Sequence, residues 1–382
     1  MSEAGTKKTR GSGQIIKIKR ENAARVLSCC KSPENMLANH LKTRRFLLFL
    51  AALAITRAFQ VCAQQLPPIE PPKPIPVPQD QSATLHVSTT EVLVPTLVVK
   101  RGGNIVYGLK ASDFALEDNG VPQKIHVQEE MDTAPVALVV AVEEGGASVL
   151  EFGKFAKMGP LLDVFLSDPS SRAALVGFDS VPHLIEDFTH DGDRINSDLQ
   201  QLEPGDGGAA ILDTVNYAVS LLETEPKEYR RVLLLIGEVR DHGSKHTRVA
   251  QLVRKIGESD VLVLSVSFSP ALAELSHDSK DSQLDDRTMN MVSALAMVIE
   301  AFKKNVVKEV ARMSGGEYTT FIGDQRFEQR VLTAAKEVRN RYLISFRPSD
   351  LTPGLHTIRV RTTEDYGARI VARENYWLDA PR

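Results

Sequence analysis

The sequence contains little cysteine, and what it has lies near the beginning of the chain. Of 382 residues, only Cys29, Cys30 and Cys62 carry a thiol. Residues 63–382 therefore cannot form a disulfide, a thiolate metal site or a cysteine nucleophile. This excludes disulfide-stapled scaffolds and cysteine-dependent enzymes for that part of the chain.

The sequence also lacks a basic excess and the local motifs of common enzymes. Its net charge of −3 argues against a nucleic-acid-binding protein, which needs a basic face. It contains no H-E-x-x-H and no G-x-S-x-G. His242 and His246 are four residues apart, but Gly243 between them predicts a solvated loop. GDGGAA at 205–210 lacks the preceding strand that a dinucleotide-binding turn requires. We therefore expect neither catalysis nor a small-molecule substrate.

The beginning of the chain indicates export. Basic residues precede a short apolar run at 46–55, FLLFLAALAI, which cannot span a bilayer and is typical of a secretory signal peptide. We predict cleavage after Ala63, so that residues 1–63 are a signal peptide with a basic n-region, or one that starts at Met36. Two alternatives stay open: acylation of Cys62 in a lipoprotein, or an uncleaved membrane anchor at 46–55. We expect a periplasmic or extracellular protein of the cell envelope.

Two segments of different character follow. Residues 64–82 are rich in proline, which favours an extended polyproline conformation and predicts a semi-rigid linker. Residues 83–132 alternate short apolar stretches with turns, and they include Asn119-Gly120, a strong hairpin signal between strands. We expect a small β-sandwich-like module in this second segment.

Between residues 133 and 340 strands and helices alternate. The predicted strands are 136–142, 173–178, 183–187, 232–237 and 261–268. The predicted helices are 151–166, 209–223, 247–258, 289–313 and 325–340. This alternation predicts an α/β domain with a doubly wound, mostly parallel, Rossmann-like sheet. Residues 341–382 return to strand patterns and predict a C-terminal β-ribbon that packs beside the sheet or onto the N-terminal β module.

The order of several segments resembles one known family. VVKRGGNIVYGLKASDFALEDNGVPQKI at 98–125 is similar to the leading β module of von Willebrand factor type A (VWA)-related proteins of the acidobacterial type. VARMSGGEYTTF, VRNRYLISFRP and HTIRVRTTEDYGARIVARENYW resemble the late segments of that family. The resemblance covers roughly Val92 to Leu378. It implies a doubly wound central domain, as the strand and helix pattern predicts independently.

The strand at 136–142 leads into residues suited to a ligand site. VALVVAV is apolar throughout and predicts a strand buried on both faces. Glu143 and Glu144 follow it directly, and then the pair Gly145-Gly146. Open α/β sheets bind ligands at the carboxyl ends of their strands. We therefore expect the loops at this edge to carry the function.

The resemblance implies a metal-ion-dependent adhesion site there, which the family builds from Asp-x-Ser-x-Ser, a Thr and an Asp-Gly on three loops. In this sequence Glu143, Gly145 and Ala147 stand at the positions of the first motif. Ala209 replaces the Thr, and Glu238 replaces the Asp of the third loop. The hydroxyl ligands are lost and the carboxylates are longer, whereas Mg²⁺ requires near-ideal geometry at about 2.1 Å. We predict a degenerate, metal-free site.

A cation site remains as an alternative. Glu143, Glu238, Asp206 and Asp241 supply carboxylates that could gather around Ca²⁺ or Mg²⁺, with Ser148 as a hydroxyl ligand. The protein would then be a cation-dependent adhesion module.

The sequence therefore predicts an exported, non-enzymatic protein-interaction module that uses the loops at the carboxyl edge and needs no cofactor. The predicted binding loops contain Glu144, Gly145, Ala147, Ser148 and Ala209. Their acids favour a basic or polar patch on a protein partner. We expect no nucleic acid as partner, and contact with a membrane only through an uncleaved segment 46–55.

Overall fold

The computed structural model describes residues 91–128, 134–268 and 291–380. The predicted signal peptide at 1–63 and the linker at 64–82 lie outside the described residues. Within the described ranges, no helix has the length and apolar character needed to cross a membrane. This finding does not cover the apolar run at 46–55, which lies outside the described residues.

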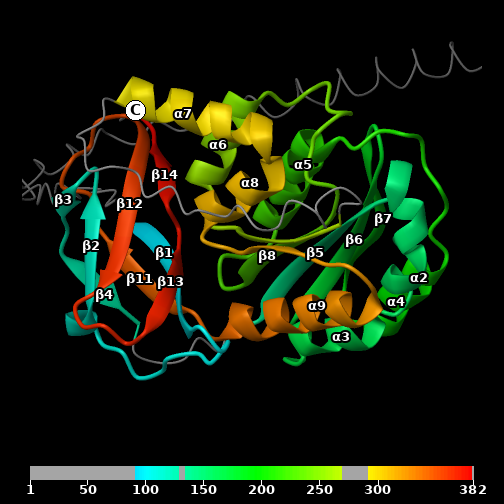
Figure 1. The fold of residues 1–382 in the computed structure, drawn as a ribbon, viewed down its shortest axis with the longest axis horizontal. Coiled ribbons are helices and arrows are strands. Elements are labelled where there is room, and N and C mark those ends of the chain that lie inside the picture. Colours follow the sequence, from blue (N-terminus) through cyan, green and yellow to red (C-terminus); the bar gives the residue numbers. More distant parts are fainter. Residues whose placement is uncertain (1–90, 129–133, 269–290, 381–382) are drawn as a thin grey trace, which may run out of the picture. The chain divides into compact units, whose positions relative to one another are not determined.

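A six-stranded sheet forms the centre of the fold (Figure 1). Its strand order is β10-β9-β8-β5-β6-β7, which is doubly wound, with β5 in the middle and β7 antiparallel to β6. The strands are β5 (Val136–Glu143), β6 (Arg172–Phe178), β7 (Pro182–Thr189), β8 (Arg230–Gly237), β9 (Leu262–Ser267) and β10 (Tyr318–Thr320). The predicted α/β class and its five strands are confirmed. β10 was not predicted, because its three half-buried residues carry no apolar run.

Both faces of the sheet are covered by helices (Figure 1). One face packs on α5 (Ile211–Glu223), α6 (Val249–Glu258), α7 (Met291–Lys304) and α8 (Val306–Ser314). The other packs on α2 (Phe152–Phe155), α3 (Gly159–Phe165), α4 (Gly192–Gln200) and α9 (Asp324–Arg339). Successive residues of β5 belong to the two apolar clusters in turn, because side chains of a strand alternate between faces. All eight residues of β5 are buried, as the apolar run predicts.

Two predicted helices are interrupted. The helix expected at 151–166 is split into α2 and α3, with Pro160 in the first turn of α3, where its missing N–H costs nothing. The helix expected at 289–313 is split into α7 and α8 at Asn305, whose side chain accepts a hydrogen bond from the N–H of Lys308 and caps α8. Gly315 ends α8 with a φ of 86°, the left-handed conformation that favours glycine.

The remaining strands form two four-stranded sheets. The first has the order β13-β1-β11-β4 and the second the order β14-β12-β2-β3. Their bounds are β1 (Val92–Lys100), β2 (Phe114–Asp118), β3 (Val121–Pro122), β4 (Ile125–Val127), β11 (Tyr342–Phe346), β12 (Gly354–Thr362), β13 (Ala368–Ala372) and β14 (Asn375–Leu378). One apolar cluster joins them, with side chains from both sheets.

Both sheets combine strands from before and after the central domain. β1 pairs with β11 and β13, and β2 pairs with β12. The two β segments that the sequence shows as separate therefore complete each other, as they share both sheets and one core. The predicted Asn119-Gly120 turn joins β2 and β3, with positive φ at both residues.

A buried hydrogen-bonded group lies within this sandwich. The Nδ1 atom of His356 is 3.1 Å from Asp118 Oδ1, and its Nε2 atom is 2.7 Å from the carbonyl oxygen of Thr352. The Tyr376 hydroxyl donates to Asp118 Oδ2 at 2.8 Å. Burial alone would lower the pKa of His356, but the bonds to Asp118 and Thr352 outweigh it and raise the pKa. A charged imidazolium satisfies both acceptors.

We expect this pair to stabilise the fold most at acidic and neutral pH. A raised folded-state pKa of a histidine contributes stability below its unfolded value, near 6.5, and this contribution is lost as pH rises through the folded value. Asp118→Asn should lower the free energy of unfolding by about 2 kcal/mol at pH 6, and by less at pH 9. Urea denaturation at the two pH values measures this difference. Glu117→Gln, on the same strand but in a solvent-exposed ion pair with Arg361, is the control and should have little effect. A loss that does not change with pH would contradict the assignment.

Candidate functional site

The three predicted loops meet at the carboxyl edge of the sheet. The N–H of Gly146 donates to Asp206 O at 3.1 Å, which joins the first loop to the second. The N–H of Glu238 donates to Glu143 Oε2 at 2.6 Å, which joins the third loop to the first. The convergence expected from the strand ends is therefore present in the structure.

Gly145 is at the closest contact between these loops. A Cβ atom added there would lie 2.2 Å from Gly208 O and 2.7 Å from Asp206 O, both backbone atoms. No side chain fits at this position without moving the second loop. The hydroxyl that the family's first motif would place here is therefore excluded by packing as well as by sequence.

Glu143 is fully buried below this contact. Burial raises its pKa to about 8; the N–H of Glu238 opposes this and the carboxylate of Glu238 adds to it. The side chain is therefore mostly protonated and neutral near pH 7. Its Oε1 atom has no hydrogen-bond partner within the described ranges.

Glu144 is directed to different neighbours, as expected for successive residues at a strand end. Its carboxylate lies against Gly177 of β6 and is 3.4 Å from His183 Nε2. Burial raises its pKa, His183 opposes this, and the nearby Asp179 adds to the rise. The carboxylates of Glu143 and Glu144 therefore do not converge on one point where a cation could be shared.

Of the remaining predicted polar groups, the Glu238 carboxylate is 3.4 Å from His242 Nε2, and the other three are engaged in hydrogen bonds. Asp206 Oδ1 accepts from Gly208 N, Ser180 Oγ and Ser180 N, and these bonds lower its pKa. Asp241 Oδ1 accepts from Leu212 N at the start of α5 and from Ser244 Oγ. The Ser148 hydroxyl, also buried, donates to Gly145 O at 2.5 Å.

The two alanines of the predicted site supply no ligand. Ala209 is fully buried, and its carbonyl oxygen accepts from His242 N. Ala147 packs against the apolar cluster that contains α2 and α3. Both side chains support the loops by packing.

This donor set does not fit a divalent cation. The Oε1 atom of Glu143, which has no hydrogen-bond partner among the described residues, and the partly exposed carboxylate of Glu238 are the ligand atoms that remain. No group of three or more His, Cys, Asp or Glu side chains in the described parts of the chain could hold a metal ion. Octahedral Mg²⁺ and the six to eight oxygens of Ca²⁺ both need more converging ligands than this edge presents.

One structural acid was missed by the sequence analysis. Asp213, in the first turn of α5, accepts hydrogen bonds from the N–H groups of Lys245, His246 and Thr247. Burial opposes its charge, but these bonds outweigh it and lower its pKa. Asp213 therefore holds the loop 240–248 in place. An Asp at the third position of a helix was the only signal, and it is common in helices with no such role.

Replacing Glu143 should change the pH dependence of stability. Because its folded-state pKa lies near 8, above the usual 4.5, the folded state keeps its proton while the unfolded chain loses it, and stability falls as pH rises from 4.5 to 8. Each pKa unit corresponds to about 1.4 kcal/mol. Glu143→Gln should remove most of this fall and be the more stable protein at pH 8.5.

Urea denaturation of both proteins at pH 5, 7 and 8.5 gives the comparison. The exposed Glu300→Gln is the matched control and should follow the wild type at every pH. Parallel pH curves for wild type and Glu143→Gln would show that Glu143 is ionised in the folded protein.

Comparison with known proteins gives structural neighbours only. No family model matches the chain, and no curated protein matches it. A von Willebrand factor type A protein from Catenulispora acidiphila is 9% identical, with a TM-score of 0.39, over 72% of this chain and 75% of that one. BatB from Bacteroides thetaiotaomicron is 15% identical, with a TM-score of 0.35, over 53% and 99%. The SpRpn10 VWA domain is 11% identical, with a TM-score of 0.34, over 52% and 94%.

Because these TM-scores are below 0.5, we assign the doubly wound fold from the strand order of this chain itself. Two of these structures, the protein from Catenulispora acidiphila and the SpRpn10 domain, are von Willebrand factor type A domains by name.

Proposed function

We propose that the protein is an exported, non-enzymatic interaction module that binds a protein partner through the loops at the carboxyl edge, without a metal ion. The observation that carries this proposal is the orientation of the edge acids. Glu143 is buried, and Asp206, Asp213 and Asp241 accept hydrogen bonds from loop N–H groups. The carboxylates stabilise the loops, which leaves other side chains to face a partner.

Apolar side chains are exposed at this edge. Leu150, in the segment after the first loop, is 82% exposed, and Val181, between β6 and β7, is 55% exposed. Ile322, just after β10, is 56% exposed. Loops on a rigid sheet commonly carry binding function, to which exposed apolar side chains contribute.

Basic side chains are exposed on the third loop. Arg240, His242, Lys245, His246 and Arg248 all face solvent, while Asp213 and Asp241 fix the backbone that carries them. A rigid loop loses little conformational entropy on binding. The charge of this loop fits an acidic patch on the partner. The acids at the edge had led us to expect a basic or polar patch from the sequence.

Export is part of the proposal and rests on the sequence of residues 1–63. The same segment supports a location in the periplasm or outside the cell, and it would supply an anchor at 46–55 if it is not cleaved. The proposal includes no catalytic group.

Loss of the exposed apolar group at the edge should weaken partner binding. We expect Leu150→Ser to reduce capture of the partner at least tenfold in a cross-linking experiment on cells that produce the protein. Leu351→Ser is the matched control, because Leu351 is 62% exposed but lies in the loop before β12, away from this edge. Both variants must melt like the wild type. Equal loss in the two variants, or loss in neither, would remove the edge from the binding site.

The cation-dependent alternative is favoured by one observation, the unpaired Oε1 atom of Glu143. A bound ion raises the melting temperature by mass action. We expect no change in melting temperature between EDTA and millimolar Mg²⁺, Ca²⁺ or Mn²⁺. An increase of several degrees that is absent in Glu143→Gln would establish the alternative, and Glu258→Gln would exclude a general effect of surface charge.

A further inference from the structure

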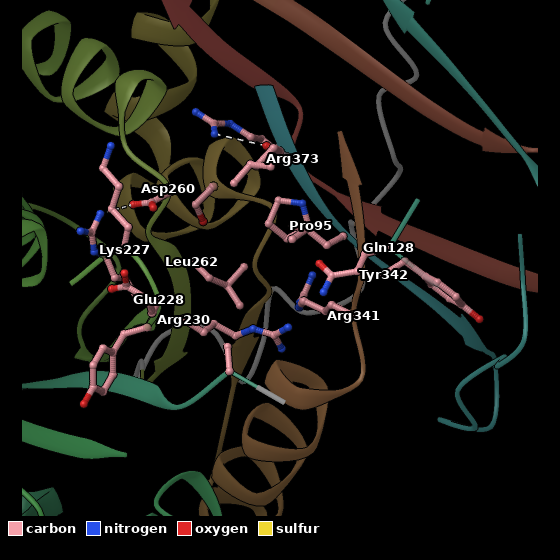
Figure 2. A pocket seen from close by; sticks show the side chains of 16 residues that line it. Pro95, Gln128, Lys227, Glu228, Arg230, Asp260, Leu262, Arg341, Tyr342 and Arg373 are labelled. Carbon is pink, nitrogen blue, oxygen red and sulfur yellow. Dashed lines mark hydrogen bonds and ion pairs between the residues drawn. The ribbon is translucent and has the colours of Figure 1, made fainter. Parts of the chain in front are cut away.

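The C-terminal end of α9 lies where the central domain meets the β-sandwich. The helix ends at Arg339, and Arg341 then leads into β11, an inner strand of the first sandwich sheet (Figure 2). The contact around this connection is close. A Cβ atom added at Gly315, after α8, would lie 2.7 Å from Arg373 N and 3.1 Å from Pro95 O, both backbone atoms of the sandwich. The sandwich therefore packs directly on the central domain here.

Four charged side chains form a cluster at this connection. Glu337, in the last turn of α9, is 5% exposed, and Arg341 is 6% exposed. Glu317, just before β10, forms an ion pair with Arg369 of β13. β10 belongs to the central sheet and β13 is an edge strand of the sandwich. The cluster thus includes groups from both parts of the structure that meet here.

The two acids of the cluster are bonded to each other. A hydrogen bond joins the carboxyl groups of Glu317 and Glu337. An ionised carboxylate has acceptors only, so this bond requires a proton on one of the two groups. Two carboxyl groups in one buried site hold a shared proton because both cannot be ionised there without a large cost.

Glu337 carries this proton and Glu317 carries the charge. Burial and the neighbouring Glu317 raise the pKa of Glu337 to about 8. Burial also opposes the charge of Glu317, but the hydrogen bonds from Arg369 and Glu337 outweigh it and lower the pKa of Glu317. Near pH 7 a neutral Glu337 therefore donates to an ionised Glu317.

The cations around the pair do not remove the proton. Burial and Glu317 together outweigh Arg341 and Arg369, which lower the pKa of Glu337. Arg369 is already paired with Glu317, and its side chain is 56% exposed, so solvent weakens its effect. Arg341 donates to a backbone carbonyl oxygen, and Figure 2 shows Arg230 of β8 beside it. The proton is therefore a fixed part of the junction at neutral pH.

Loss of the proton would act on α9. It would leave two negative charges within hydrogen-bonding distance inside the fold, where like charges repel strongly. Glu317 is held in place, because its carbonyl oxygen accepts from Ser265 N at 2.8 Å and its carboxylate pairs with Arg369. Glu337 is the group that can move away, together with the last turn of α9.

We propose that Glu317 and Glu337 form a proton-dependent contact, which holds the last turn of α9 against β10 at neutral pH and releases it when the shared proton is lost at alkaline pH. Because α9 continues into β11, the release also loosens the sandwich on the central domain. Stability from this contact is present at low pH and declines as pH rises toward 8, since the folded chain keeps a proton that the unfolded chain loses near 4.5.

Hydrogen exchange with mass spectrometry tests the contact on the whole purified chain. Peptides that cover 316–320 and 331–346 are compared at pH 7 and pH 9, after correction for the pH dependence of intrinsic exchange. The wild type should lose protection in these peptides by about tenfold at pH 9, while α4 keeps its protection. Equal protection of 316–320 and 331–346 at the two pH values would overturn the proposal.

A variant that imitates the protonated acid is the second test. Glu337→Gln keeps a donor at this position, because an amide N–H can bind the Glu317 carboxylate without losing a proton. Its protection should be the same at pH 7 and pH 9. Glu328→Gln, the same change on a partly exposed position of α9, is the matched control and should lose protection as the wild type does. A pH-dependent loss in Glu337→Gln as large as in the wild type would overturn the proposal.

Infrared difference spectroscopy detects the shared proton even if Glu337→Gln does not fold. Glu143 at the carboxyl edge also has a pKa near 8, so the measurement uses Glu143→Gln as the background. The C=O band of a protonated carboxyl group should be present in this variant at pH 7 and absent at pH 9. The same variant should still lose protection at 331–346. Absence of the band at pH 7 would overturn the proposal.

Discussion

The carboxyl edge of this protein depends on one close contact, at which the first loop meets the second with no space for a side chain. Gly145 lies directly against the carbonyl oxygens of Gly208 and Asp206. Any substitution there would have to displace backbone, which is far more costly than moving the end of a flexible side chain. The contact brings the loops together, and it leaves no room at position 145 for a hydroxyl-bearing side chain.

Direct bonds hold the three loops together at this edge. Glu143, neutral because it is buried, accepts the N–H of Glu238 from the third loop. The N–H of Gly146 binds the second loop, and Asp213 holds the loop 240–248 through three N–H groups. A metal ion in an edge of this kind would link the loops through shared ligands. Here Glu143, Asp206 and Asp241 accept backbone hydrogen bonds that link the loops directly, which favours binding by a preformed surface.

The sequence predicts those parts of the fold that local patterns determine. The apolar run at 136–142 became β5, and the alternation around it became the doubly wound sheet. Asn119-Gly120 formed the expected turn, because its positive φ values are a local property. β10 was not predicted, since it is stabilised by pairing with β9 and not by its own composition. The break at Asn305 was also missed, because the apolar spacing continues across it.

The sequence could predict which residues lie at the carboxyl edge, because the order of strands and loops determines this. It could not predict where their side chains point. Glu143, Ala209 and Glu238 do lie on loops that meet, but no sequence pattern indicates the direction of a carboxylate. The burial of Glu143 and the inward bonds of Asp206 and Asp241 result from the packing of loops that are distant in sequence. The same limit applies to the shared sheets, where β1 pairs with strands more than 240 residues later in the chain.

Those long-range pairings determine the chemistry at the other end of the central sheet. Because β11 and β13 pair with β1, Arg341 and Arg373 are brought to the amino ends of β8 and β9, where Arg230 and Arg231 begin a strand. Arg231 forms an ion pair with Asp260, and Arg373 donates hydrogen bonds to backbone carbonyl oxygens, so both can be explained as parts of the structure. Arg341 donates to Gly315 O, and although burial lowers its pKa to about 10, the nearby Glu337 and Glu317 oppose this and favour its charged form. Burial of these guanidinium groups at one end of the sheet is therefore offset by acids and backbone carbonyl oxygens of the chain that lie beside them.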